Sequence, residues 1–239
     1  MFGIVMATYF RNNNKTKKYL CRSITSILKQ TFSDWVLIIV GDKYEPEEEL
    51  LGIIELFKQR TSNKIIYLKN TNVERDFIED KGKLWNIAGA TSINMGLNYL
   101  RENNIKYYCH LDDDDYWSNK HLWALNEIYS KYENCIFANT QSSNVSNGFL
   151  PVTNEIEIKE NNILPEKGKI IHSSFSFRCD IIKYNYYTTF DENGYFAPSD
   201  GIMLDNIGNF LLENKQYCSI YNPIFTCYHD RRGETRRKI

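Results

Sequence analysis

Residues 105–117 read IKYYCHLDDDDYW, an apolar run that passes directly into four consecutive aspartates. The run from Ile105 to Leu111 has the composition of a buried β-strand. Asp112 to Asp115 would then follow the carboxyl end of that strand. Taken alone, an acidic run of this kind is more simply interpreted as a solvated turn that caps the next helix. The sequence on either side must therefore distinguish a ligand site from a turn.

The chain before this run alternates between strand-like and helix-like segments. Short apolar runs predict strands, and apolar residues three or four positions apart predict helices. This alternation predicts an α/β fold with a mostly parallel central sheet and helices on both faces. A polar stretch from Lys69 to Lys83 follows the third strand and is predicted to be a loop, and from residue 139 to 170 the glycines and prolines favour hairpins or loops. The predicted strands are 2–8, 35–40, 64–68, 105–111 and 135–138, and the predicted helices are 17–29, 50–57, 94–100 and 122–129.

Polar side chains follow several of these strands at the point where each strand ends. Thr8 and Tyr9 follow the first strand, and Gly41 and Asp42 follow the second. The acidic run 112–115 follows the fourth. Because parallel sheets bind ligands at the carboxyl ends of their strands, we expect these residues to converge on one crevice.

The acidic run needs a positive partner if it is buried. Like charges a few ångströms apart raise each other's pKa, and a divalent cation relieves that repulsion. Carboxylate oxygens select Mg²⁺ or Mn²⁺, which proteins commonly hold with one or two carboxylates together with the phosphates of a substrate. The run therefore favours a metal site that also contacts a diphosphate.

Composition excludes several other classes of protein. The 239 residues include 29 basic and 30 acidic side chains, so no global field favours nucleic acid or an anionic membrane. The six cysteines form no C-x-x-C pair or zinc-like cluster, which favours a reducing compartment. We expect a cytoplasmic protein without an integral membrane segment, because no signal sequence or long apolar run is present.

Together these motifs resemble family 2 glycosyltransferases of the GT-A fold, in both order and spacing. The stretch HLDDDDYW resembles their D-x-D signature in its L-D-x-D-D-x-W setting. The resemblance covers residues 1–125 well and the rest loosely. It implies one GT-A domain over residues 1–239, with a nucleotide-sugar-binding half at 1–125 and a less regular acceptor-binding half at 126–239. The segments that carry the resemblance are 7–11, 22–31, 35–42, 92–96 and 110–117.

The resemblance implies donor-binding roles at the predicted crevice. In the family, the position of Tyr9 packs against the nucleotide base and that of Asp42 accepts a hydrogen bond from it, which favours a UDP or dTDP donor. The family has a second acid where Gly41 stands and an Arg where Ile93 stands. From the residues alone, Tyr9 is as compatible with a core aromatic as with a base-binding residue. Lys83 is similarly compatible with a solvated position in a polar loop. The donor-binding residues implied are Thr8, Tyr9, Arg11, Asp42, Lys83, Asn94, Asp112 and Asp113.

The family's general base is the Asp of an E-D pair, and Asp200 matches it with Ser199 in place of the Glu. Asp191 and Asp205 are the competing acids, more simply interpreted as a turn and a solvated helix face. The resemblance implies an inverting in-line displacement in which Asp200 deprotonates the hydroxyl of a saccharide or other acceptor.

The metal ligands implied are Asp114, Asp112 and His229, with Mn²⁺ or Mg²⁺ as the cofactor. Arg231 and Arg232 are candidates to neutralise the leaving diphosphate, and the alternative is that residues 231–238 are simply a frayed basic end. The remaining histidines, His110, His121 and His172, are predicted to serve packing or the surface.

Three alternatives remain open from sequence. A sugar nucleotidyltransferase would need a glycine-rich phosphate loop after the first strand, where residues 8–15 contain no glycine. A haloacid-dehalogenase-like phosphatase would place its D-x-D after the first strand of the fold. A non-catalytic nucleotide-sugar or saccharide-binding module is the third alternative, because Ser199 and Gly41 depart from the family pattern.

Overall fold

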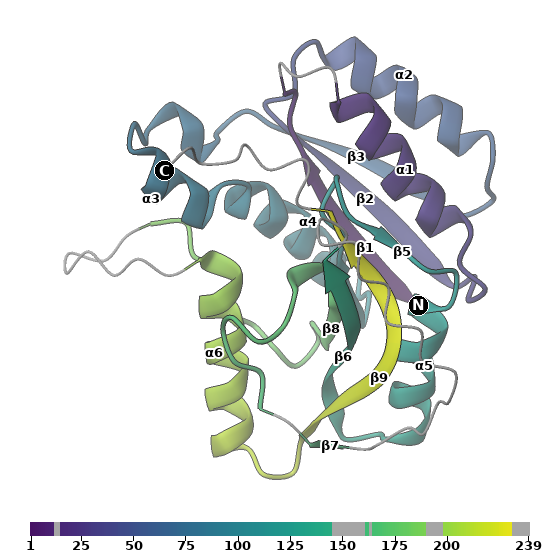
Figure 1. Cartoon of the computed structure of the whole chain (residues 1–239), viewed down its shortest axis with the longest axis vertical. Coiled ribbons are helices and arrows are strands. Elements are labelled where there is room, and N and C mark those ends of the chain that lie inside the picture. Colours follow the sequence, from purple (N-terminus) through teal and green to yellow (C-terminus); the bar gives the residue numbers. More distant parts are fainter. Residues whose placement is uncertain (12–14, 145–160, 163, 190–197, 231–239) are drawn as a thin grey trace.

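A computed structural model describes residues 1–11, 15–144, 161–162, 164–189 and 198–230 (Figure 1). Its first four strands are parallel neighbours in the order β3-β2-β1-β4. Residues of β1 and β2 are buried along nearly their whole length, as expected of parallel strands covered on both faces. The bounds are β1 Phe2–Thr8, β2 Trp35–Asp42, β3 Ile65–Asn70 and β4 Tyr107–His110.

The sheet continues beyond β4 with strands from the second half of the chain. Next to β4 lies β8, which runs antiparallel to it, and β6 and β9 follow as a parallel pair. The short strands β5 and β7 both pair with β9. The bounds are β5 Tyr116–Trp117, β6 Cys135–Asn144, β7 Asn161–Asn162, β8 Phe175–Arg178 and β9 Cys218–His229.

Helices cover both faces of this sheet (Figure 1). Ile4 packs in a core with α1, α2 and α5, whereas its neighbour Val5 packs in a second core with α4 and α6. Consecutive strand residues point to opposite faces, so one strand serves both cores. The bounds are α1 Thr16–Leu28, α2 Glu47–Lys58, α4 Ala90–Glu102, α5 His121–Lys131 and α6 Ser199–Glu213. The predicted α/β fold with helices on both faces is confirmed.

The structure differs from the sequence prediction in two segments. The stretch 69–83, predicted as polar loop, contains a 3₁₀ turn, η1 Glu74–Asp76, and the start of a short helix, α3 Lys81–Ile87. Strand β6 extends to Asn144, six residues past the predicted end at Ala138, because β9 pairs with its polar continuation. A second 3₁₀ turn, η3 His172–Ser174, precedes β8.

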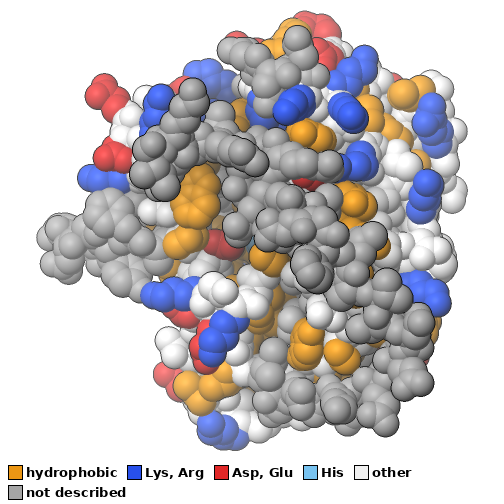
Figure 2. Space-filling model, viewed as in Figure 1, with side chains coloured by type: hydrophobic (Ala, Val, Ile, Leu, Met, Phe, Trp, Pro, Cys, Tyr) orange, Lys and Arg blue, Asp and Glu red, His pale blue; other side chains and the backbone are white. Residues whose placement is uncertain are grey.

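On the face in Figure 2, acidic and basic side chains are interspersed, in keeping with a net charge of −1. Among the described residues, no helix combines the length and apolar character needed to cross a membrane.

Candidate active site

The four aspartates form the turn between β4 and β5, and α1 holds the backbone of this turn. The hydroxyl of Ser23 lies 2.9 Å from the carbonyl oxygen of Asp113 and also contacts that of Asp115. The guanidinium of Arg22 donates to the carbonyl oxygen of Asp114. These contacts explain why the segment 22–31 accompanies the acidic run: α1 fixes the shape of the turn.

Two of the four carboxylates have close side-chain partners within the fold. Arg11 donates to both oxygens of Asp113, at 2.8 and 2.6 Å, and the Thr8 hydroxyl donates at 2.6 Å. Asp115 is fully buried, and both its oxygens lie 3.1 Å from Nδ1 of His229 at the end of β9. Asp113 and Asp115 thus tie the turn to β1 and β9, whereas Asp112 and Asp114 each line two neighbouring cavities.

A smaller cavity of about 120 Å³ lies at the carboxyl ends of β1 and β2. The guanidiniums of Arg11 and Arg75 lie 4.4 and 4.5 Å from the ring centre of Tyr9, which is 36% exposed. The structure brings together most of the predicted donor-binding residues here. The cavity is lined by Ala7, Thr8, Tyr9, Arg11, Asp42, Arg75, Ala88, Gly89, Ile93, His110, Asp112, Asp113 and Asp114.

Asp42 is buried beside this cavity and has its own partners. Its Oδ1 accepts a 2.6 Å hydrogen bond from the Ser92 hydroxyl, and its Oδ2 pairs with Arg75. Sequence reasoning missed Arg75, because it lies in the segment that was predicted to be loop and only the 3₁₀ turn η1 brings it to Asp42. A carboxylate oxygen accepts more than one hydrogen bond, so these contacts leave acceptor capacity.

A larger cavity of about 540 Å³ adjoins the smaller one and shares Asp112 and Asp114 with it. Asp200 enters from the first turn of α6, where its Oδ1 accepts the backbone N–H of Gly201 at 2.9 Å. His229 at the end of β9 and Trp85 of α3 also line this cavity, and Trp85 is 61% exposed. The predicted base and the three predicted metal ligands therefore line one space.

The electrostatics of the larger cavity favour a cation. Burial, together with the carboxylates of Asp113, Asp112 and Asp115, raises the pKa of Asp114 to about 8. Burial also raises the pKa of Asp200, and the charge of Asp112 adds to this effect. Carboxylate oxygens around a site of excess negative charge suit Mg²⁺ or Mn²⁺, so Asp112 and Asp114 fit the ion predicted from sequence.

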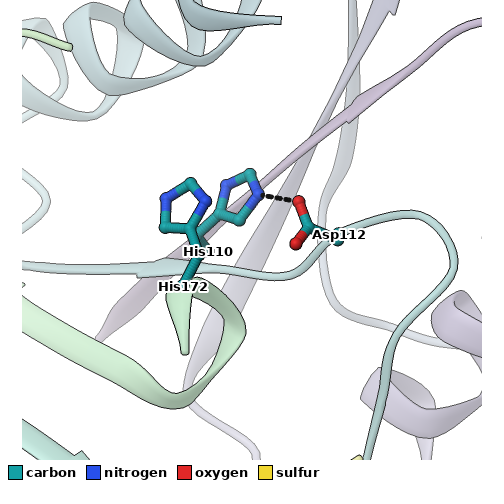
Figure 3. A group of neighbouring side chains, drawn as sticks. All are labelled: His110, Asp112 and His172. Atoms are coloured by element: carbon teal, nitrogen blue, oxygen red, sulfur yellow. Dashed lines mark hydrogen bonds and ion pairs between the residues drawn. The ribbon is translucent and has the colours of Figure 1, made fainter. Parts of the chain in front are cut away.

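A group of three possible metal ligands with closely spaced ligand atoms is formed by His110, Asp112 and His172 (Figure 3). One ligand atom from each lies within 4.8 Å of the others, and Nε2 of His110 is 2.8 Å from Oδ1 of Asp112. The two imidazoles are stacked 3.7 Å apart and 8° from parallel, so their in-plane lone pairs do not converge on one point. The prediction that these two histidines serve packing or the surface is thus incomplete, because His110 directly supports Asp112.

Other predicted residues lie elsewhere. Among the described residues that line the two cavities, neither Lys83 nor Asn94 is included. Asn94 bonds the backbone N–H and carbonyl of Tyr186, at 2.7 and 2.8 Å. Asp205 accepts the backbone N–H of Lys167 at 3.1 Å. The predictions for Asp191, Arg231 and Arg232 lie outside the described residues.

Comparison with known proteins shows which family this chain belongs to. No protein-family model matches the chain. The chain is 46% identical over 240 residues to the uncharacterized glycosyltransferase R139 of Acanthamoeba polyphaga mimivirus. The match covers 98% of this chain and 96% of that one. It is also 35% identical over 115 residues to the uncharacterized glycosyltransferase MJ1057 of Methanocaldococcus jannaschii, covering 48% of this chain and 32% of that one. The chain therefore belongs to the glycosyltransferases, as its motifs predicted.

Solved structures show the same fold. S. aureus TarS 1-349 in complex with UDP matches with a TM-score of 0.62 at 14% identity, over 96% of this chain and 60% of that one. The mannosyltransferase PcManGT from Pyrobaculum calidifontis, in complex with GDP-Man and Mn²⁺, matches with a TM-score of 0.60 at 11% identity. This match covers 95% of this chain and 56% of that one. The chain thus spans less than two thirds of the length of these structures, and the likeness identifies a GT-A fold.

Proposed function

We propose that this chain transfers a sugar from a UDP- or dTDP-sugar to an acceptor hydroxyl with inversion, using a divalent cation at Asp112 and Asp114. The observation that carries the proposal is the position of Asp114. Its carboxylate lies where the two cavities meet, with a pKa raised by burial and by three neighbouring carboxylates. A cation there removes the repulsion and attracts a diphosphate.

The smaller cavity is proposed to hold the nucleotide. The exposed part of Tyr9 would contact the base, and the Asp42 carboxylate would accept the imino hydrogen of uracil or thymine. Arg75 holds Asp42 from the other oxygen and so orients it. Residues 1–125 would form the donor half in this proposal, and the walls from 167 to 230 would belong to the acceptor half.

Asp112 and Asp114 would hold the metal ion, together with His229, which lines the same cavity. Bound there, a divalent cation supplies positive charge that stabilises the departing diphosphate. Thr8 and Arg11 bind Asp113 and thereby keep the turn in place. TarS with UDP and PcManGT with GDP-Man and Mn²⁺ support this assignment through their shared fold.

Asp200 is proposed as the general base. Its raised pKa makes it a better proton acceptor than an ordinary exposed carboxylate. The acceptor hydroxyl would give its proton to Asp200 while its oxygen attacks the anomeric carbon from the face opposite the diphosphate. One displacement of this kind inverts the anomeric configuration and requires no protein nucleophile.

Thermal unfolding with UDP-, dTDP- and GDP-sugars, in Mn²⁺ or in chelator, tests the proposal. We expect UDP- or dTDP-sugars to raise the melting temperature only with Mn²⁺, because a ligand that binds the folded state alone stabilises it. Asp114→Asn should lose this coupling, and Asp205→Asn, which lies outside both cavities, should keep it. Wild-type coupling in Asp114→Asn contradicts the metal assignment. Coupling without transfer or donor hydrolysis identifies a binding module instead.

A further inference from the structure

A third cavity, of about 760 Å³, adjoins the larger active-site cavity and is not used by the proposed chemistry. Ile170 and Ile171 line both spaces, so the two cavities share this part of the wall. The floor of the third cavity comes from β6, whose polar continuation past Ala138 was not expected from sequence. Asn139, Gln141 and Ser142 of this strand line it together with Tyr221 of β9.

Among the described residues, the walls of the third cavity combine polar groups with apolar side chains and carry little charge. Asn139, Gln141 and Ser142 offer amides and a hydroxyl. The two charged residues in the wall, Glu166 and Lys169, pair with each other at 2.5 Å. The cation in the described wall is already paired, which disfavours a phosphate, and the amides and hydroxyl of β6 disfavour an acyl chain. Neutral hydroxyl groups are the ligands that such a surface binds best.

Two further features favour a sugar ring. Asn139 and Tyr221 are partners across the parallel strands β6 and β9, so their side chains share one face of the sheet. Asn139 is 4% exposed, and its Oδ1 has no hydrogen-bond partner within the described parts of the chain. The half-buried ring of Tyr221 beside the amides and hydroxyl of β6 matches a sugar, which has hydroxyl groups at its edge and C–H groups on its faces.

We propose that the third cavity is a saccharide subsite that binds acceptor units preceding the one whose hydroxyl reacts beside Asp200. The inference rests on the proposed function and makes the acceptor a neutral oligosaccharide rather than a lone monosaccharide. The chain of sugars would cross Ile170 and Ile171, whose apolar side chains suit the faces of sugar rings. Acceptor length would then control affinity through residues that touch neither donor nor metal.

Calorimetric titration with three neutral series tests this subsite: glucose to maltopentaose, glucose to cellopentaose, and N-acetylglucosamine to chitopentaose. In the wild type we expect at least one series to bind about tenfold more tightly at full length than as the monosaccharide, as a well-formed extra contact provides. Tyr221→Ala and Gln141→Ala should each reduce this gain to about threefold or less. Gln216→Ala, at an exposed position outside the cavity, should keep the full gain.

The stabilisation of each variant by UDP-sugar and Mn²⁺ is measured without saccharide, which checks folding and separates the two proposals. Intact donor coupling with no length dependence in any series overturns the subsite. The subsite is also overturned if Tyr221→Ala and Gln141→Ala both keep the wild-type gain in affinity with oligosaccharide length. Length-dependent binding that is lost in the variants, in a protein without donor coupling, supports the subsite while the proposed function fails.

Discussion

The two cavities that share Asp112 and Asp114 handle charge in opposite ways. The two most buried carboxylates that line the smaller cavity have cationic partners from the fold: Asp113 has Arg11, and Asp42 has Arg75. In the larger cavity, burial and neighbouring charge raise the pKa values of Asp114 and Asp200. The first site is complete as folded, whereas the second carries negative charge that a ligand must balance.

This difference indicates that the charged residues of the smaller cavity serve mainly stability, whereas those of the larger cavity serve mainly the reaction. Paired charges hold a binding surface in one shape before the ligand arrives, which lowers the cost of binding. Carboxylates with raised pKa values are suited to take up a proton or a metal ion. We therefore expect substitutions in the smaller cavity to affect folding first, and those in the larger cavity to affect turnover first.

The largest effect is expected at Asp200. Asp200→Asn keeps the shape of the side chain but removes the proton acceptor, so kcat should fall by about 10²- to 10⁴-fold. Stabilisation by UDP-sugar and Mn²⁺ should remain, since Asp200 contacts neither in the proposed arrangement. Steady-state transfer assays measure the first quantity and thermal unfolding the second. Asp205→Asn on the same helix is the matched control, and a kcat near wild type in Asp200→Asn would assign the base elsewhere.

Arg11 tests the smaller cavity. Arg11→Met leaves the buried Asp113 without its bidentate partner, and we expect a loss of about 3 kcal/mol in the free energy of unfolding. Urea titration measures this loss. Lys58→Met provides the comparison, because it breaks an ion pair with Glu55 that is exposed and worth at most about 1 kcal/mol. If the two variants lose equal stability, the smaller cavity is not held by its ion pairs.

His121, buried behind the acidic turn and stacked on Trp117, gives a pH-dependent test of the packing that supports both cavities. Burial lowers its pKa from 6.5 to about 3. The unfolded chain therefore takes up the proton first. The stability from this residue is complete above pH 6.5 and falls as pH drops towards 3, by about 1.4 kcal/mol per pH unit. Urea titrations should show this slope shrinking in His121→Gln, and an unchanged slope would contradict the assignment.

The sequence predicted those parts of the fold and site that depend on local pattern. Apolar runs such as Phe2–Thr8 predicted the parallel strands, and the rule that ligands bind at their carboxyl ends brought Tyr9, Asp42 and the acidic run together. Asp200 and His229 were found through the family resemblance, and the structure places both in the larger cavity.

What escaped prediction depends on tertiary contacts. Helix α3 has seven residues, too few to show a helical period, so Trp85 was not noticed. Arg75 reaches Asp42 only through a 3₁₀ turn in a polar segment. The third cavity escaped because the polar half of β6 is a strand only by virtue of its pairing with β9. Such side chains acquire their roles from neighbours that are distant in sequence.

Trp85 provides the smallest test and concerns the acceptor side alone. Its indole is 61% exposed at the wall of the larger cavity, where a flat apolar face can stack on the acceptor sugar. Trp85→Ala should raise the KM for acceptor by about three- to tenfold, in line with 0.5–1.5 kcal/mol for an aromatic contact, and leave the KM for donor unchanged. Trp123→Ala, at a 37% exposed position on α5, is the matched control. An equal rise in both KM values would place Trp85 at the donor, and the larger cavity would then lose its separate acceptor wall.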